Sequence, residues 1–167
     1  MNVRSTFASL LILIIATVVA TTQPSSAIAP EHGPSAVGSG AFSFLRDSGT
    51  EGWQFSFEAF ANKNGHARGH ALFQKFFHQT GFEFEVKINC LKVFTSNDAI
   101  ISGTVLRSDD PEFPKHADVI FGAVDGSPSS LFDIITRPFS FPGVDCENGG
   151  FPLTFFQIPP DSITIQP

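Results

Sequence analysis

The sequence predicts an all-β fold: an antiparallel barrel of about eight or nine strands, with a β-sandwich as the alternative. From Gly40 onward, apolar and polar residues alternate with a period of two, as they do in half-buried strands. Turn-forming sequences separate these runs, and no segment after residue 27 has helical periodicity. Consecutive hairpins favour an up-and-down order, but patterning alone leaves barrel and sandwich both open.

The first segment, residues 1–27, is predicted to be a secretory signal peptide. A short polar start carries Arg4, an almost unbroken apolar run follows over 7–20, and the segment ends in small residues. Small residues at the −3 and −1 positions place the cleavage after Ala27, so the mature chain begins at Ile28. The apolar run is shorter than the roughly 20 residues that span a membrane. We therefore expect a secreted or periplasmic protein without an integral membrane segment after cleavage.

The mature chain divides into a leader and one domain. Residues 28–39 are mostly Pro, Gly, Ser and Ala and are predicted to form a flexible leader, and residues 40–167 form a single β-domain. Without Arg4, nine basic and sixteen acidic residues remain, which gives a net charge of −7. An acidic chain without a Lys/Arg cluster is not expected to bind nucleic acid.

Strands are expected in the following order along the domain. The runs lie near residues 42–44, 53–59, 66–74, 82–90, 99–106, 119–124, 131–135, 153–158 and 162–165. Asn64-Gly65 predicts a tight hairpin between the second and third runs. The run over 82–90 alternates most regularly and is expected to direct Phe84, Ile88 and Cys90 to the same face.

Two cysteines, Cys90 and Cys146, lie 56 residues apart. An even number of cysteines in an exported protein predicts one intramolecular disulfide. In the chain-entropy model a loop of this length contributes about 4 kcal/mol. Two buried free thiols or an intermolecular bridge remain the alternatives. No Cys-x-x-Cys pair indicates a redox or zinc motif.

No residue pattern predicts a catalytic site, a metal site or a cofactor. Gly-x-Ser-x-Gly is absent. Glu83 and Glu85 share a strand face with Lys87, which is typical of a solvent-exposed ladder. The acidic loop at 109–112 lacks the ligand order of an EF-hand, and His66 and His70 are too far apart along a strand to share a metal. Whether the domain is an enzyme stays open, with a non-enzymatic role favoured.

Phenylalanine is the most unusual feature of the composition, with 20 Phe, one Trp and no Tyr. Phe73, Phe82 and Phe84 cluster around one hairpin and are candidate lining residues of an apolar pocket. A plain Phe-rich core is the other interpretation. The favoured function is a secreted, non-enzymatic binding or structural domain at the cell exterior. The alternative is a small β-barrel carrier or cyclase-like enzyme. The corresponding partners are a cell-surface molecule or a small apolar ligand.

Several short motifs recur together along the chain. They are Gly-Ser-Gly-Ala-Phe-Ser-Phe at 38–44, Asn-Cys-Leu-Lys-Val at 89–93, Ser-Gly-Thr-Val at 102–105 and a closing strand at 161–165. As a set they resemble an uncharacterised family of secreted, mostly bacterial all-β domains. The resemblance implies an exported β-rich domain but no activity. The chain departs from that family at 125–127, where Asp-Gly-Ser stands in place of a longer Asp-Asn-Gly-Glu-Gly-like loop.

Overall fold

The computed structural model describes residues 33–47, 49–77, 80–95, 97–127, 130–148, 150 and 154–167. The predicted signal peptide and the first part of the predicted leader, residues 28–32, lie outside these ranges. Within the described ranges there is no helix that is long and apolar enough to cross a membrane.

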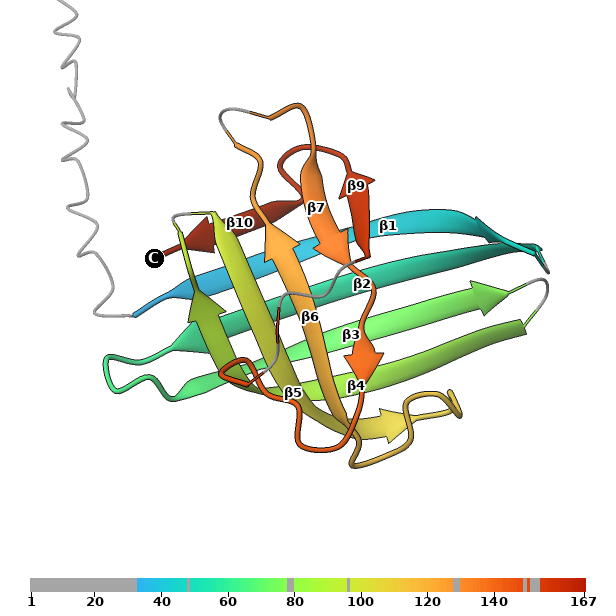
Figure 1. The fold of residues 1–167 in the computed structure, drawn as a ribbon, viewed down its shortest axis with the longest axis horizontal. Helices are drawn as coiled ribbons and strands as arrows, with labels where there is room; N and C mark the ends of the chain where they lie inside the picture. Colours follow the sequence, from blue (N-terminus) through green and yellow to red (C-terminus); the bar gives the residue numbers. More distant parts are fainter. Residues whose placement is uncertain are drawn as a thin grey trace, which may run out of the picture. The chain divides into compact units, whose positions relative to one another are not determined.

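The described residues form ten strands in a single antiparallel sheet (Figure 1). Their bounds are β1 Ser35–Arg46, β2 Gly49–Ala61, β3 Ala67–Phe77, β4 Thr80–Val93, β5 Asp98–Ser108, β6 Asp118–Val124, β7 Asp133–Thr136, β8 Phe139–Ser140, β9 Phe155–Ile158 and β10 Ile163–Gln166. The all-β, antiparallel fold class predicted from the alternating pattern is confirmed. So is the hairpin at Asn64-Gly65, where Gly65 has a φ of 80°.

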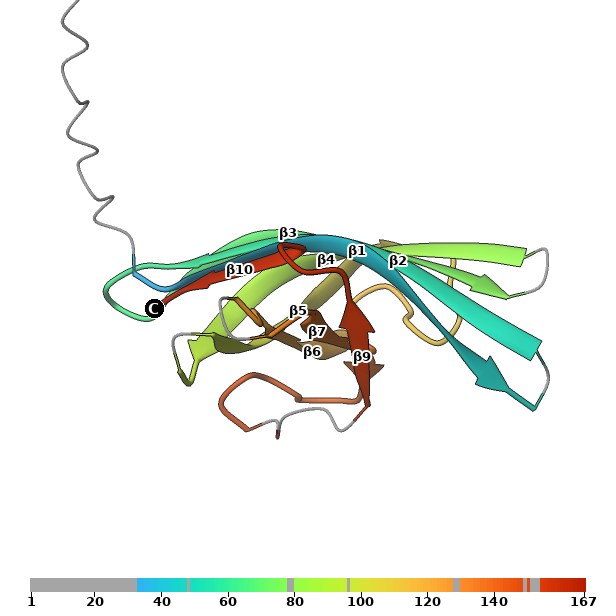
Figure 2. The same cartoon turned by 90° about the horizontal axis from the view of Figure 1, so that it is seen from above.

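The sheet is an up-and-down meander that curls into a half-barrel. The strand order is β10-β1-β2-β3-β4-β5-β6-β7-β9, and β8 pairs with β6. The long strands β1–β4 lie in one layer, and β5, β6, β7 and β9 turn beneath it (Figure 2). At the open side, the Phe156 ring of β9 stacks on the Phe42 ring of β1 with centroids 4.3 Å apart. Side-chain packing therefore joins β9 to β1.

Two carboxylates accept hydrogen bonds from the backbone N–H groups on the edge of β10 that faces away from β1. Asp133 is almost fully buried and accepts hydrogen bonds from the backbone N–H groups of Ile163 at 2.8 Å and Gly126 at 2.9 Å. Asp125 accepts one from the N–H of Ile165 at 3.3 Å. Because a buried N–H without a partner is costly, these carboxylates do for β10 what another strand would do.

One strand face carries the core. Rings from different strands meet on this inner face, and Trp53 contacts Phe73, Phe84 and Phe113 edge-on at centroid distances between 6.2 and 6.5 Å. Phe73 also packs against Phe121 at 5.1 Å. Burying each such ring contributes about 2 kcal/mol, and seven of the 20 phenylalanines are buried in this core.

The leader is shorter than the sequence indicates, because residues 35–39 belong to β1. The small residues in this segment are there because large side chains occupy the space above them. Ala36 is fully buried, and a Cβ on Gly38 would lie 2.8 Å from the Phe57 ring and 2.9 Å from Ile163. Residues 35–39 thus form a strand although they have little apolar surface, because large side chains of neighbouring strands pack over them.

A β-bulge in β4 moves Cys90 to the outer face of the sheet. Ile88 pairs with Gly103 and Cys90 with Ser102, so Asn89 is an additional residue in β4. One additional residue reverses the alternation beyond it. The prediction that Cys90 shares a face with Phe84 and Ile88 is therefore wrong.

Candidate functional site

The predicted disulfide between Cys90 and Cys146 is present, with the two Cα atoms 5.8 Å apart. It attaches residues 141–148, here called the covering loop, to the outer face of the sheet. A small second core forms under this loop from Ile100, Ile120, Val144 and Cys146. The prediction of an intramolecular disulfide is thereby confirmed, and the alternative of two free thiols is wrong.

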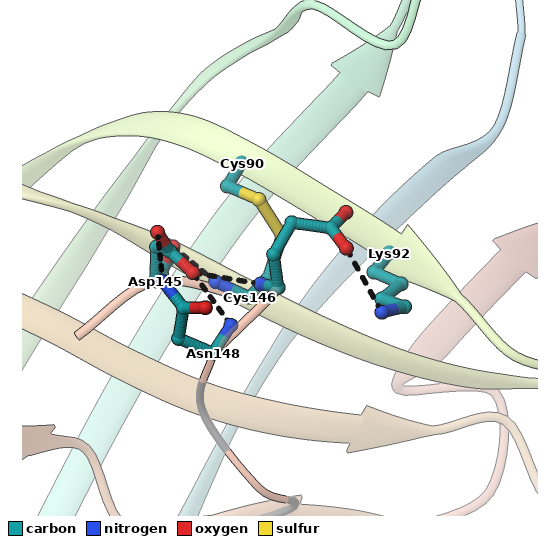
Figure 3. The surroundings of a disulfide bond; sticks show 7 residues. Cys90, Lys92, Asp145, Cys146 and Asn148 are labelled. Atoms are coloured by element: carbon teal, nitrogen blue, oxygen red, sulfur yellow. Dashed lines mark hydrogen bonds and ion pairs between the residues drawn. A yellow bond between two sulfur atoms is a disulfide. The ribbon is translucent and has the colours of Figure 1, made fainter.

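Polar contacts fix the covering loop around the disulfide (Figure 3). The N–H of Cys146 donates to Ser102 Oγ at 3.1 Å. Asp145 Oδ1 accepts hydrogen bonds from the backbone N–H groups of Glu147 and Asn148. Lys92 Nζ pairs with Glu147 Oε2 at 3.0 Å. Among the described residues, Glu147, Cys90 and Cys146 are the one group of three whose potential metal-ligand atoms lie close to one another. The two sulfurs are bonded to each other, so the group is not a metal site.

The candidate pocket residues Phe73, Phe82 and Phe84 lie on the inner face, against the rings of the core. Phe73 and Phe84 are fully buried and stack with centroids 5.1 Å apart. Phe82 is half-buried at the edge of the core, and its ring lies 5.4 Å from Lys75 Nζ. The structure brings the three residues together as packing and not as the walls of an open cavity.

Next to these rings lies a group of charged side chains that the sequence did not predict to lie together, although two of them come from the acidic loop at 109–112. This inner ion cluster consists of Glu51, Lys75, Asp110, Glu112 and Arg137. Lys75 Nζ lies 2.7 Å from Asp110 Oδ2 and 3.0 Å from Glu112 Oε2. Arg137 contacts Glu112 and lies 3.8 Å from Glu51. Five charged side chains from four parts of the chain thus meet at one end of the core.

Aromatic rings enclose the cations of this cluster. Lys75 Nζ lies 5.7 Å from the centroid of the Trp53 ring and 6.0 Å from that of Phe113. Trp53 Nε1 donates a hydrogen bond of 2.6 Å to Glu51. Burial raises the pKa of the Glu112 carboxyl, but the hydrogen bond from Lys75 and the charges of Arg137 and Lys75 outweigh it and hold the pKa below its ordinary value.

A groove of about 600 Å³ crosses the opposite, outer face of the sheet. Six neighbouring strands, β10 and β1 to β5, line it. With strands about 4.8 Å apart, it extends over about 24 Å. We call it the outer groove. Its hydroxyl groups come from Ser39, Ser56, Ser162 and Thr164, and its ionisable side chains are Glu58, His70, Glu85, Arg107 and Asp161.

Ion pairs join the side chains at one end of the outer groove. Glu85 lies 3.5 Å from His70 Nδ1 and 2.6 Å from Arg107 Nε, and Arg107 also lies 3.6 Å from Glu83. The hydrogen bond and charge of Glu85, with the charge of Glu83, raise the pKa of the Arg107 guanidinium. A second bulge, at Leu106, gives Arg107 this position, because it sets Arg107 opposite Glu85.

The sequence holds a signal for the inner ion cluster but none for the outer groove. Lys75 continues the inner-face series of Ala71 and Phe73, and Glu51 precedes Trp53 by two residues on that face. A charge at an inward position is therefore the signal that could have found the cluster. The outer groove has no such signal, since its residues follow the polar alternation of any exposed face. Comparisons with protein-family models, with curated proteins and with solved structures gave no match for this chain.

Proposed function

We propose that this protein is an exported, non-enzymatic binding domain that holds a polar ligand in the outer groove. The observation that carries the proposal is the groove itself, an open depression that six strands share and that hydroxyl and ionisable side chains line together with a few apolar ones. A rigid sheet is a suitable support for a binding site because its backbone fixes the side chains without further ordering.

Three features support a role outside the cell. The signal-like segment at 1–27 predicts export. A disulfide persists in oxidising compartments and is rare in reducing ones. The resemblance to secreted all-β domains points to the same location. The product recovered outside the cell should begin at Ile28, and a product retained in the membrane would contradict the proposal.

The chemistry of the outer groove favours a ligand with positive charge and hydroxyl groups. The described lining residues of the groove include three carboxylates and one permanent cation. The carboxylates are Glu58, Glu85 and Asp161, and the cation is Arg107. Acidic surfaces attract cations, and serine and threonine hydroxyls can both donate to and accept from a hydroxylated ligand. An oligosaccharide with free amino groups combines both properties.

The alternative function, an apolar carrier or cyclase-like enzyme, lacks support in the geometry. It needs an open interior lined by phenylalanine, and at Phe73 and Phe84 the rings fill the space that a ligand would take.

Titration with glucosamine oligomers, followed by calorimetry, tests the proposal. The charged oligomer should bind, and its fully N-acetylated counterpart should bind more weakly. Glu58→Gln should weaken binding about fivefold, the effect of one exposed charge pair. Asp47→Asn, at the exposed β1–β2 turn outside the groove, is the matched control and should bind like the wild type. Equal binding of both oligomers, or of neither, would exclude the proposed ligand class.

A further inference from the structure

Lys75 and Asp110 meet in a setting that water hardly reaches. Lys75 lies on the inner face of β3, and Asp110 lies in the loop that follows β5. Their side chains are 11% and 0% exposed, and Nζ lies 2.7 Å from Oδ2. The rings of Trp53, Phe82 and Phe113 surround the nitrogen at 5.4 to 6.0 Å. An amine and a carboxyl are thus held in contact inside an aromatic enclosure.

An ion pair is a costly occupant of such an enclosure. Removing two charges from water takes several kcal/mol for each ion, and their mutual attraction recovers it only when further hydrogen bonds satisfy them. Asp110 Oδ2 is buried and has no hydrogen bond of acceptable geometry within the described part of the chain. Asp110 Oδ2 therefore lies close to Lys75 Nζ, but its charge is incompletely stabilised by hydrogen bonds.

The geometry points to an amide bond between Lys75 Nζ and Asp110 Cγ that the chain forms by itself. The Nζ–Cγ bond forms, the Cγ–Oδ2 bond breaks, and Oδ2 leaves as water. The Lys75 ammonium gives up two protons, and both end on the departing oxygen. One cation and one anion thereby become one neutral amide and one water molecule, with no oxidant, reductant or other co-reactant. The step also removes the two buried charges.

Neighbouring groups have the positions that this condensation needs. The Glu112 carboxylate accepts a hydrogen bond from Lys75 Nζ at 3.0 Å, so it can take a proton from the ammonium and pass it to Oδ2. The backbone N–H of Glu112 donates to Asp110 Oδ1 at 2.9 Å. That donor remains in place for the negative charge that develops on Oδ1 as Nζ attacks. Oδ1 then becomes the amide oxygen.

Local backbone contacts hold the aspartate in place. The N–H of Asp110 donates to Ser108 Oγ at 2.9 Å, and the carbonyl of Asp110 accepts from the N–H of Phe113 at 3.1 Å. Fixing two reacting groups in contact removes most of the entropy cost of bringing them together. The proposal concerns a modification inside the fold and goes beyond ligand binding in the outer groove.

The Lys92–Glu147 pair is an internal control. Its nitrogen and oxygen are 3.0 Å apart, close to the 2.7 Å between Lys75 and Asp110, but its side chains are 36% and 68% exposed. Water solvates both charges there and competes as the reaction partner of any activated carboxyl. The Lys75–Asp110 and Lys92–Glu147 pairs therefore have similar distances and differ mainly in how far water reaches them.

Peptide mass spectrometry of the purified, reduced and alkylated wild-type protein tests the bond. Trypsin does not cleave after an acylated lysine, so residues 69–87 should stay intact and appear joined to residues 108–115. The joined species should be lighter than the sum of its peptides by one water, and its fragmentation should place the bond at Asp110. A free peptide ending at Lys75, a bond at Glu112, or a bond between Lys92 and Glu147 would each overturn the proposal.

Two variants test the mechanism. Lys75→Arg keeps the cation among the rings but removes the attacking amine, and it should release residues 108–115 as a free peptide. Glu112→Gln keeps Lys75 and Asp110 but removes the proton acceptor, and it should leave them mostly unjoined. A fully joined Glu112→Gln protein would overturn the role of Glu112. On denaturing gels under reducing conditions, the wild type should migrate faster than Lys75→Arg because its internal ring persists. Equal migration would contradict the bond.

Discussion

The outer face of the sheet has two halves that the chain treats differently. Over β5 and β6, the covering loop lies on Ile100 and Ile120 and is attached by the disulfide. Over β1 to β3 and the part of β4 that precedes Cys90, the same face presents Glu58, His70 and their neighbours in the open outer groove. The outward positions are mostly polar in the outer groove, with Val37 and Leu72 as exceptions, whereas Ile100 and Ile120 under the covering loop are apolar. The polarity of the outward side chains therefore differs between the covered and the uncovered part of the face.

Removing the disulfide should change the stability of the covered half more than any of the single substitutions proposed below. Replacing Cys90 and Cys146 together by serine should lower the free energy of unfolding by about 4 kcal/mol, because the unfolded chain regains the entropy of a 56-residue loop. Guanidinium unfolding measures this loss. Limited proteolysis should then cut first within the covering loop, and a first cut in β1–β4 would contradict the attachment role.

Matched truncations compare the two halves directly. Ile100→Ala leaves a cavity under the covering loop and should cost about 3 kcal/mol. Leu72→Ala, on the half-buried floor of the outer groove, should cost less than about 1 kcal/mol because water already reaches that side chain. Similar losses in thermal unfolding for both variants would remove the distinction.

A matched pair of serines gives a smaller contrast. Ser102→Ala removes the acceptor of the buried Cys146 N–H and should cost about 2 kcal/mol. Ser56→Ala, in the outer groove, leaves no buried donor behind and should be neutral in the same denaturant titration.

The smallest expected effect on stability is that of Arg107→Gln. Its ion pairs with Glu83 and Glu85 are exposed, so the unfolding midpoint should not change measurably. Affinity for a cationic oligomer should instead rise, because the variant removes the one permanent cation among the described lining residues. Weaker binding would show that Arg107 contacts the ligand favourably.

The sequence predicted the fold class and the disulfide because both follow from local patterns or simple pairing. It failed where one residue interrupts the pattern, as Asn89 does before Cys90. It also failed at 35–39, where small residues are strand because of what covers them. The inward position of Lys75 was the available signal for the inner ion cluster, but its partners could not be predicted because Asp110 and Glu112 meet Lys75 only in the folded sheet.

Trp53 gives the protein a built-in optical reporter. It is the one tryptophan of a chain without tyrosine, so the intrinsic emission excited at long ultraviolet wavelengths comes from a single indole. That indole donates to Glu51 and lies within 5.7 Å of both Lys75 and Arg137. Its emission colour should respond when the Lys75 charge disappears into an amide. It should stay constant when a ligand occupies the outer groove, so one spectrum can follow the maturation of the fold separately from binding.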